Sequence, residues 1–242
     1  MPKTPAAPTR QFDLIAFDWD GTLFDSTAII TRCIQRAVVD VGGQEPTREA
    51  ASYVIGMALM PALAHAAPDV SKDKYPALGE RYRHHYFAIQ HEISLFEGVL
   101  PMLAALKERG ISVKIVTGDS ELVTQHVCGQ LNIPVLGVLT GKEITALDDA
   151  ALRVMVEKTN LFCRVNPAQK ERVILALKAR GHVVGYLGDG INDAPSLHAA
   201  DVGLSVDTAV DVAKEAADMI LLDHDLHVLH DGVLEGRRTF GN

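Results

Sequence analysis

Short apolar runs alternate with helical patterns along most of the chain. The runs that we predict as strands end in small or acidic residues and lie at 14–17, 113–116, 161–165, 183–187, 202–206 and 219–222. Continuous apolar runs of this length are typical of strands that are buried on both faces of a parallel sheet. The alternation therefore predicts an α/β fold, a doubly wound and mostly parallel sheet with helices between its strands.

Two helix boundaries are well marked by glycine and proline. One predicted helix begins near Pro101 and is closed by Gly110, and another runs from Pro167 to Arg180 and is followed by Gly181. Proline is favoured in the first helical turn and glycine just past the last one. We therefore predict one helix at each of these two places, between predicted strands.

Residues 26–95 break the alternation and read as consecutive helices without a buried strand. We predict a helical cap domain over 26–95, inserted into a core domain formed by 11–25 and 96–242, with a disordered N-terminus over 1–10. Most of the aromatic residues of the cap are expected to hold its helices together, with the alternative that one of them lines a substrate pocket; they are Tyr75, Tyr82, Tyr86 and Phe87. His84, His85 and His91 lack paired carboxylates at ligand spacing and are expected at the surface.

Composition and charge exclude several partners. The 242 residues are 48% hydrophobic and carry a net charge of −8, from 31 acidic and 23 basic residues. Without a basic tract, neither nucleic acid nor an anionic membrane surface is an expected partner. Three widely spaced cysteines build no disulfide framework, and no apolar stretch is long enough to span a bilayer. We expect a cytoplasmic protein, and the oligomeric state is left open.

The strongest chemical signal is a pair of carboxylates, Asp18 and Asp20, directly after the first predicted strand and followed by Gly21. Ligands of parallel sheets bind at the carboxyl ends of strands, where both acids fall. One carboxylate can attack a phosphoryl group while its neighbour protonates the leaving oxygen and then activates water. The alternatives are a surface turn or part of a calcium loop, but the further ligands of an EF-hand are absent.

Three further strand ends or helix starts complete this signal. Thr117 ends the second strand, Asp189 and Asp193 follow the strand at 183–187, and Lys170 opens a helix. Each has an ordinary reading, as a helix cap, a strand-to-helix turn or a solvated lysine. Together they are the parts of a magnesium-dependent phosphoryl site, with Asp18 and Asp189 on Mg²⁺ and with Lys170 and Thr117 on the phosphoryl oxygens.

At these residues the chain resembles the phosphohydrolases of the haloacid dehalogenase superfamily. Their four motifs correspond to Asp18-Trp19-Asp20-Gly21-Thr22, Thr117, Lys170 and Gly188-Asp189-Gly190-Ile191-Asn192-Asp193. The resemblance implies Asp18 as the nucleophile and Asp20 as the acid and base, with the Asp20 backbone carbonyl on the metal. It also implies Thr117, Gly118, Lys170 and Asn192 on the phosphate, and Asp189 on Mg²⁺ with the support of Asp193.

Two parts of the chain resemble different branches of this superfamily. Residues 12–110, with the helical insert, are similar to phosphoglycolate-phosphatase-like enzymes. From Ile111 onward the segments 114–120, 165–170, 188–195 and 236–240 resemble the phosphorylation domain of a P-type cation ATPase, most closely the bacterial magnesium-transporting kind. We therefore expect a chimera with its junction near 107–111.

These observations predict a Mg²⁺-dependent phosphomonoester hydrolase that forms an aspartyl phosphate on Asp18 and acts on a small phosphorylated substrate. In the pumps the residue equivalent to Asp20 is Thr, which transfers no proton, so the presence of Asp20 favours turnover. Two alternatives remain open. One is a phosphoryl-accepting fragment of a cation pump, and the other is an engineered chimera that folds but has little activity.

Overall fold

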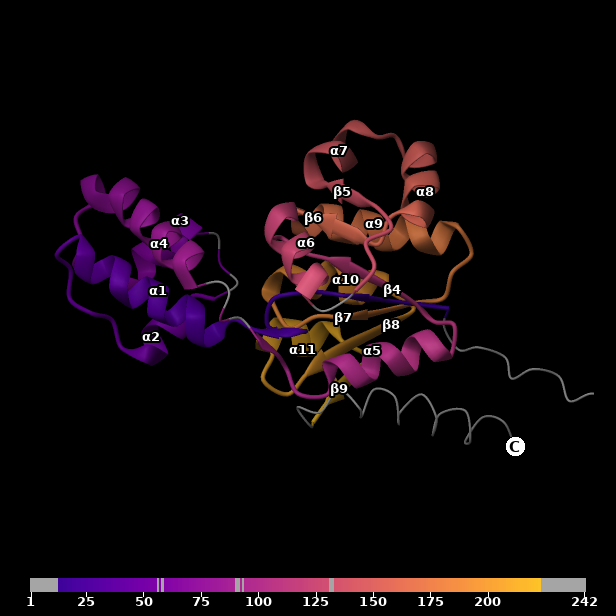
Figure 1. Ribbon diagram of the computed structural model, residues 1–242, viewed down its shortest axis with the longest axis horizontal. Helices are drawn as coiled ribbons and strands as arrows, with labels where there is room; N and C mark the ends of the chain where they lie inside the picture. Colours follow the sequence, from indigo (N-terminus) through magenta and orange to yellow (C-terminus); the bar gives the residue numbers. More distant parts are fainter. Residues whose placement is uncertain are drawn as a thin grey trace, which may run out of the picture. The chain divides into compact units, whose positions relative to one another are not determined.

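The computed structural model describes residues 13–55, 57, 59–89, 92, 94–130 and 133–222. Contacts within the chain divide it into two compact units. The inserted unit is Leu23–Phe96, and the core unit comprises the chain up to Thr22 together with the chain from Glu97 onward. We describe each unit by itself (Figure 1).

The core unit contains a seven-stranded sheet in the order β5-β6-β4-β1-β7-β8-β9, and every described pair of neighbours is parallel. This architecture confirms the predicted α/β fold. The strands are β1 (Leu14–Phe17), β4 (Ser112–Val116), β5 (Val138–Thr140), β6 (Leu161–Cys163), β7 (Val184–Leu187), β8 (Val202–Val206) and β9 (Met219–Leu221).

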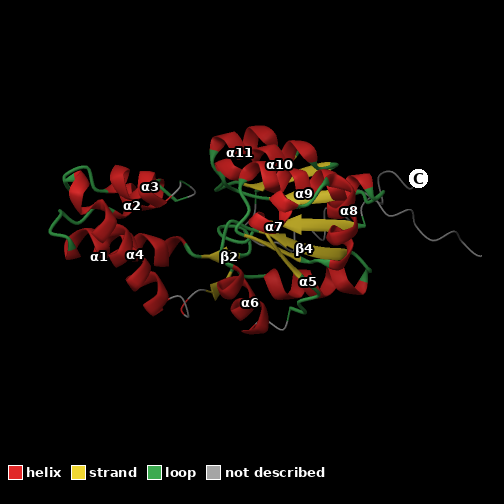
Figure 2. Ribbon diagram, turned by 90° about the horizontal axis from the view of Figure 1, so that it is seen from above, coloured by secondary structure: helices red, strands yellow, loops and turns green. Residues whose placement is uncertain are grey.

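Helices cover both faces of this sheet, as Figure 2 shows. On one face lie α5 (Val99–Glu108) and α6 (Glu121–Gln130). On the other lie α9 (Pro167–Ala179), α10 (Ala194–Ala199) and α11 (Asp211–Ala216). Two further helices, α7 (Gly141–Ala146) and α8 (Asp149–Lys158), pack against α9. Because β1 lies in the middle of the sheet, all four of its residues are buried.

The marked helix ends lie close to where the sequence predicts them. In α9, Asn166 caps the first turn, Pro167 occupies its first position, and Gly181 follows the end of the helix with a φ of +91°. The other helix, α5, starts two residues before Pro101, at Val99 after Gly98. The proline therefore marks the first turn rather than the first residue, as is usual for proline in a helix.

The hydrophobic pattern misses β5. This strand has only three residues, of which Leu139 alone is fully buried. It lies at an edge of the sheet and pairs with β6 only. An edge strand of this length presents too few apolar positions for a pattern of hydrophobic residues to reveal it.

The inserted unit is helical, as expected, with a short antiparallel strand pair at its two ends. Its helices are α1 (Thr27–Asp40), α2 (Arg48–Tyr53), α3 (Leu59–Ala66), the 3₁₀ turn η1 (Lys72–Lys74) and α4 (Tyr75–Ile89). The strand pair is β2 (Phe24–Asp25) with β3 (Ser94–Leu95). Residues from α1, α2, α3 and α4 form one apolar core in this unit.

The aromatic residues of α4 divide into packed and exposed ones. Tyr75 and Tyr82 pack against the apolar core of the unit, and Tyr86 stacks on Tyr82. Phe87 is 58% exposed, so the expectation that it holds the helices together is wrong. Tyr75, Leu78 and Tyr82 follow helical spacing, and Phe87 is off that stripe.

Some of the sequence predictions concern residues that the structure describes, and others concern residues outside them. His84 is exposed, and His85 is half-buried with its Nε2 2.7 Å from Oδ2 of Asp40. His91, the predicted disordered N-terminus and the pump-like segment 236–240 lie outside the described residues. Within the described part of the chain, no helix combines the length and the apolar character needed to cross a membrane.

Candidate active site

The site lies where three neighbouring strands end. Asp18 follows β1, Thr117 follows β4 and Asp189 lies two residues after β7. Since β4 and β7 flank β1 as parallel partners, the carboxyl ends of all three strands meet at one edge of the sheet. The structure therefore brings these segments together as the sequence predicts.

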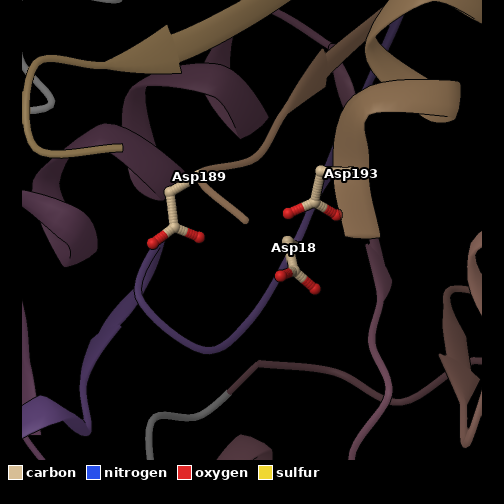
Figure 3. Close-up of side chains that lie close together, drawn as sticks. All are labelled: Asp18, Asp189 and Asp193. Carbon is tan, nitrogen blue, oxygen red and sulfur yellow. The ribbon is translucent and has the colours of Figure 1, made fainter. Parts of the chain in front are cut away.

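Three carboxylates converge on one space at this edge (Figure 3). One oxygen each of Asp18, Asp189 and Asp193 lies within 4.8 Å of the others. Lys170 enters the same cluster from the first turns of α9, and its Nζ lies 2.7 Å from Oδ1 of Asp18 and 2.8 Å from Oδ1 of Asp193. Lys170 is only 3% exposed, which excludes its reading as a solvated helix residue.

Asp193 is held on both of its carboxylate oxygens. Oδ1 accepts hydrogen bonds from Lys170 and, at 2.7 Å, from the hydroxyl of Tyr186, and Oδ2 accepts one of 3.0 Å from the backbone N–H of Gly190. The side chain of Asp193 is fully buried. Its surroundings fit a residue that orients Lys170 better than one that directly binds a metal.

Burial and mutual repulsion dominate the electrostatics of the cluster. Burial raises the pKa of Asp18 well above its usual range, and the neighbouring Asp193 adds to this effect while Lys170 opposes it. Burial and Asp193 likewise raise the pKa of Asp189 to about 6. Burial alone would lower the pKa of Lys170, but Asp18 and Asp193 hold it above its usual value. The lysine therefore stays charged, while the protonated forms of Asp18 and Asp189 are favoured relative to those of free carboxyl groups.

Asp20 and Asp119 form a second acidic group beside the cluster. Asp20 is half-buried in the loop after β1, and burial followed by the charge of Asp119 raises its pKa well above the usual range. Asp119 is bonded to Thr117, whose Oγ1 accepts a hydrogen bond of 3.1 Å from the backbone N–H of Asp119. Thr117 itself is buried. A raised pKa favours the protonated form of a carboxyl group, which is the form that a general acid needs.

The remaining predicted residues lie at the margin of the site. Gly118 is exposed and directly follows Thr117, and Asn192 is exposed within the 3₁₀ turn η3 (Ile191–Asp193).

Sequence reasoning gave no role to Thr22, which donates a hydrogen bond of 3.3 Å to Oδ1 of Asp189. It also missed Asp119 and Tyr186. The signal for Asp119 was its position two residues after Thr117, at the end of the same strand.

The donor set of the cluster fits a hard divalent cation. All its candidate ligands are carboxylate oxygens, and Mg²⁺ typically uses one or two carboxylates while water and phosphate complete its octahedron. Because both oxygens of Asp193 already accept hydrogen bonds, Asp18 and Asp189 are the pair best suited to hold the ion. Asp20 is outside this trio of side chains.

Gly21 allows the loop after β1 to pass close to the Asp189 side chain, so a larger residue at this position should disturb the site. Gly21 has a φ of +77°, and a Cβ at this position would collide with the Asp189 carboxylate. Gly181 also has a positive φ, of +91°, but a Cβ there has no neighbour within 4 Å. We expect Gly181→Ala to lower the free energy of unfolding by about 1 kcal/mol through backbone strain alone, and Gly21→Ala to lower it further because its Cβ also collides with the Asp189 carboxylate.

Only Gly21→Ala should also weaken Mg²⁺ binding, by about tenfold or more, because it displaces Asp189. Urea unfolding and calorimetric titration with Mg²⁺ measure the two effects. Equal Mg²⁺ affinities in both variants would contradict the role that we assign to the contact between Gly21 and Asp189.

The raised pKa of Asp189 predicts how stability depends on pH without metal. Its pKa is about 6 in the folded chain against a usual 3.8, so the folded state binds more protons between these values. The free energy of unfolding should therefore rise as the pH falls from about 6 toward 4.5. Asp40 and Glu157, whose pKa values are lowered, lose their contribution only at more acidic pH.

Urea unfolding in EDTA at several pH values measures this slope. Asp189→Asn should reduce this slope without abolishing it, because the raised pKa values of Asp18 and Asp20 act in the same direction. Mg²⁺ should oppose the slope because the ion binds the ionised carboxylate. An unchanged slope in Asp189→Asn would show that Asp189 does not carry the effect.

The sequences of known relatives match a part of this chain. The chain is 56% identical over 146 residues to the P-type magnesium-transporting ATPase 1 of Salmonella typhimurium, and the match covers 60% of this chain. It is 38% identical over 142 residues to calcium-transporting ATPase 1 of Saccharomyces cerevisiae. The chain spans 16% of the length of the Salmonella protein and 15% of the yeast protein.

Solved structures resemble the chain over a larger part of its length. A predicted phosphoglycolate phosphatase from Haemophilus somnus 129PT superposes with a TM-score of 0.68 at 18% identity, over 92% of this chain and 99% of that one. A putative haloacid dehalogenase-like hydrolase from Bacteroides fragilis superposes with a TM-score of 0.65 at 19% identity, over 89% and 99% of the two chains. At these identities the likeness establishes the fold.

A model of one protein family matches most of the chain. The model describes haloacid dehalogenase-like hydrolases and matches residues 12–201, which include every acid of the cluster and Lys170. The match agrees with the resemblance that the motifs predict and with the parallel sheet. The chain belongs to the haloacid dehalogenase-like hydrolase family.

Proposed function

We propose that the protein is a Mg²⁺-dependent phosphomonoester hydrolase that works through a phosphoaspartate on Asp18. The observation that carries this proposal is the Lys170 ammonium, which is 2.7 Å from Oδ1 of Asp18 at the edge of an acidic cluster. A nucleophilic carboxylate beside a fixed positive charge suits the attack on an anionic phosphoryl group, because the charge on the phosphoryl oxygens is then neutralised.

In the first step, a carboxylate oxygen of Asp18 attacks phosphorus, and the bond from phosphorus to the leaving oxygen breaks. Lys170 and Thr117 bind the phosphoryl oxygens, and Asp20 gives its proton to the leaving alkoxide. When Mg²⁺ is bound, Asp18 and Asp189 would hold it, and the ion would neutralise charge at the phosphoryl group. The raised pKa of Asp20 supports its role as the acid, because it favours the protonated form.

In the second step, the Asp20 carboxylate takes a proton from water, and the water oxygen attacks phosphorus. The bond between phosphorus and the Asp18 oxygen breaks, which releases inorganic phosphate and restores both aspartates. Since the same residue acts as acid and then as base, its protonation state is reset in every cycle.

The family and the fold support this reading without fixing the substrate. The chain is a member of a hydrolase family, and a neighbouring structure is titled a predicted phosphoglycolate phosphatase. We propose a small phosphorylated substrate, with phosphoglycolate as one candidate. We also propose that residues 26–95 act as the cap domain that selects it, that Gly118 and Asn192 contact its phosphate, and that the protein acts in the cytoplasm.

A second candidate function follows from the likeness to pumps. The identity of 56% over 146 residues to a magnesium-transporting ATPase favours a phosphoryl acceptor that forms a long-lived aspartyl phosphate. This candidate shares Asp18, Lys170 and Asp189 with the first one. The two differ at Asp20, since only a residue that transfers protons speeds the hydrolysis of the intermediate.

Asp18→Asn should abolish Mg²⁺-dependent phosphate release, because an amide is not a nucleophile toward phosphorus. The measurement is the hydrolysis of p-nitrophenyl phosphate by the purified chain, with Mg²⁺ and with EDTA, beside the variant. The Gly181→Ala variant is a matched control, because its strain is remote from the acids. Activity retained in Asp18→Asn, or equal rates with Mg²⁺ and EDTA, would contradict the proposal.

Asp20→Thr should slow turnover by about a hundredfold or more and let the phosphoenzyme accumulate, because general acid and base catalysis is lost. Rapid acid quenching followed by detection of acid-stable phosphate on the protein measures the intermediate. Turnover equal to that of the parent chain would remove Asp20 from the assigned role. A parent chain that itself accumulates phosphoenzyme would favour the second candidate.

A further inference from the structure

Tyr186 belongs to the buried cluster, although the mechanism above gives it no task. It lies in β7 with no exposed surface, and its hydroxyl donates a hydrogen bond of 2.7 Å to Oδ1 of Asp193. The same oxygen accepts a hydrogen bond of 2.8 Å from Nζ of Lys170. A buried tyrosine normally finds a partner for its hydroxyl, so the informative fact is which partner it has.

The sheet provides room for the tyrosine ring. The register partners of Tyr186 are Ala16 on β1 and Gly203 on β8, the smallest residues of their strands. Side chains in register on neighbouring parallel strands point to the same face, so the ring is flanked by a methyl group and a hydrogen. Because β7 lies between β1 and β8, the backbone that carries the ring is paired on both sides.

Asp193 needs a second donor that stays in place. Lys170 is shared between Asp193 and Asp18, and in the proposed reaction its ammonium also binds the transferred phosphoryl group. If Lys170 were the sole donor to Oδ1, any movement of the ammonium would leave a buried carboxylate oxygen unpaired, which is costly. The Tyr186 hydroxyl keeps that oxygen paired throughout.

A tyrosine suits this task because it is neutral. Burial and the charge of Asp193 raise the pKa of Tyr186 well above its usual range, so the hydroxyl remains a donor. A cation at this position would compete with Lys170 for the charge of Asp193. The neutral hydroxyl fixes the direction of the carboxylate and leaves Lys170 as its counter-charge.

We propose that Tyr186 is a positioning residue for phosphoryl transfer, which holds Asp193 and, through it, aims the Lys170 ammonium at Asp18. The inference rests on the proposed function for its kinetic consequence, but the hydrogen-bond chain itself can be tested in a protein with no activity at all. It assigns a role to a strand residue outside the motifs that the sequence analysis singled out.

Tyr186→Phe should lower kcat about tenfold while KM and the Mg²⁺ affinity stay within about twofold. A displaced Lys170 ammonium stabilises the transition state less, because charge develops on the phosphoryl group there. A tenfold loss in kcat corresponds to about 1.4 kcal/mol of transition-state free energy. Tyr75→Phe removes the same hydroxyl from a residue that packs on the core of the inserted unit and is the matched control. A loss of stability without a change in kcat would overturn the proposal.

A double-mutant cycle tests whether Tyr186 acts through Asp193. Asp193→Asn should lower kcat strongly, and adding Tyr186→Phe should cause no further loss, because the residue that transmits the effect is already gone. Losses that multiply in the double variant would show that Tyr186 acts independently of Asp193, which contradicts the inference.

Nuclear magnetic resonance of the lysine ammonium groups gives a readout without activity. In metal-free protein, the Lys170 ammonium should give a protected ¹H–¹⁵N signal, because it is buried and bonded to two carboxylates; Lys170→Met assigns it. Lys114 is the internal reference, since its buried Nζ is bonded to the carbonyls of Val156 and Thr159. Tyr186→Phe should shift or broaden the Lys170 signal and leave that of Lys114 unchanged.

The outcomes separate the two proposals. If the parent chain hydrolyses no phosphomonoester but Tyr186→Phe perturbs only the Lys170 signal, the proposed function fails and the positioning role stands. If the parent chain is active and the Lys170 signal is the same in Tyr186→Phe and Tyr75→Phe, the positioning role fails and the function stands. A change in both lysine signals would indicate a general loosening of the core and would overturn the positioning role.

Discussion

The Lys170 ammonium, shared between Asp18 and Asp193, is the interaction on which the site depends. It joins the end of β1 to the start of α9 and to the turn before α10, three segments that lie far apart in the sequence. The Lys170 ammonium is 3% exposed, and these two carboxylates of opposite charge stabilise it. Removing either the lysine or its partners would therefore leave buried charge unpaired.

The same constraint explains why small residues surround the acids. Gly21 lets the loop after β1 pass against Asp189, and Gly188 leaves room for the Asp193 side chain, since a Cβ at either position would meet these carboxyl groups closer than real contacts allow. Burial and mutual repulsion also raise the pKa values of Asp18 and Asp189. Close packing and electrostatics therefore act on the same carboxyl groups.

The site residues at the strand ends could be predicted from the sequence, but the buried residues that hold them in place could not. Asp18, Thr117 and Asp189 could be predicted because their chemistry directly follows continuous apolar runs, and parallel strands bring such ends together. Tyr186 lies inside an apolar run, where an aromatic residue reads as core, and its hydroxyl gains meaning only from the position of Asp193. A hydrogen bond between side chains on different elements leaves no periodic signal in a sequence.

The part of the chain that resembles phosphoglycolate phosphatases and the part that resembles cation pumps both contribute residues to the Asp18–Lys170–Asp193 cluster. The predicted junction at 107–111 lies in the turn between α5 and β4, where Gly110 has a φ of +66°. Asp18 comes before that turn and Lys170 after it, and β1 is paired on both sides with strands from after it. If the two parts were of separate origin, they would have to match both the register of β1 and the position of one carboxylate. The short ion pair between Asp18 and Lys170 meets the second condition, and the pairing of Phe17 with Ile115 and Leu187 meets the first.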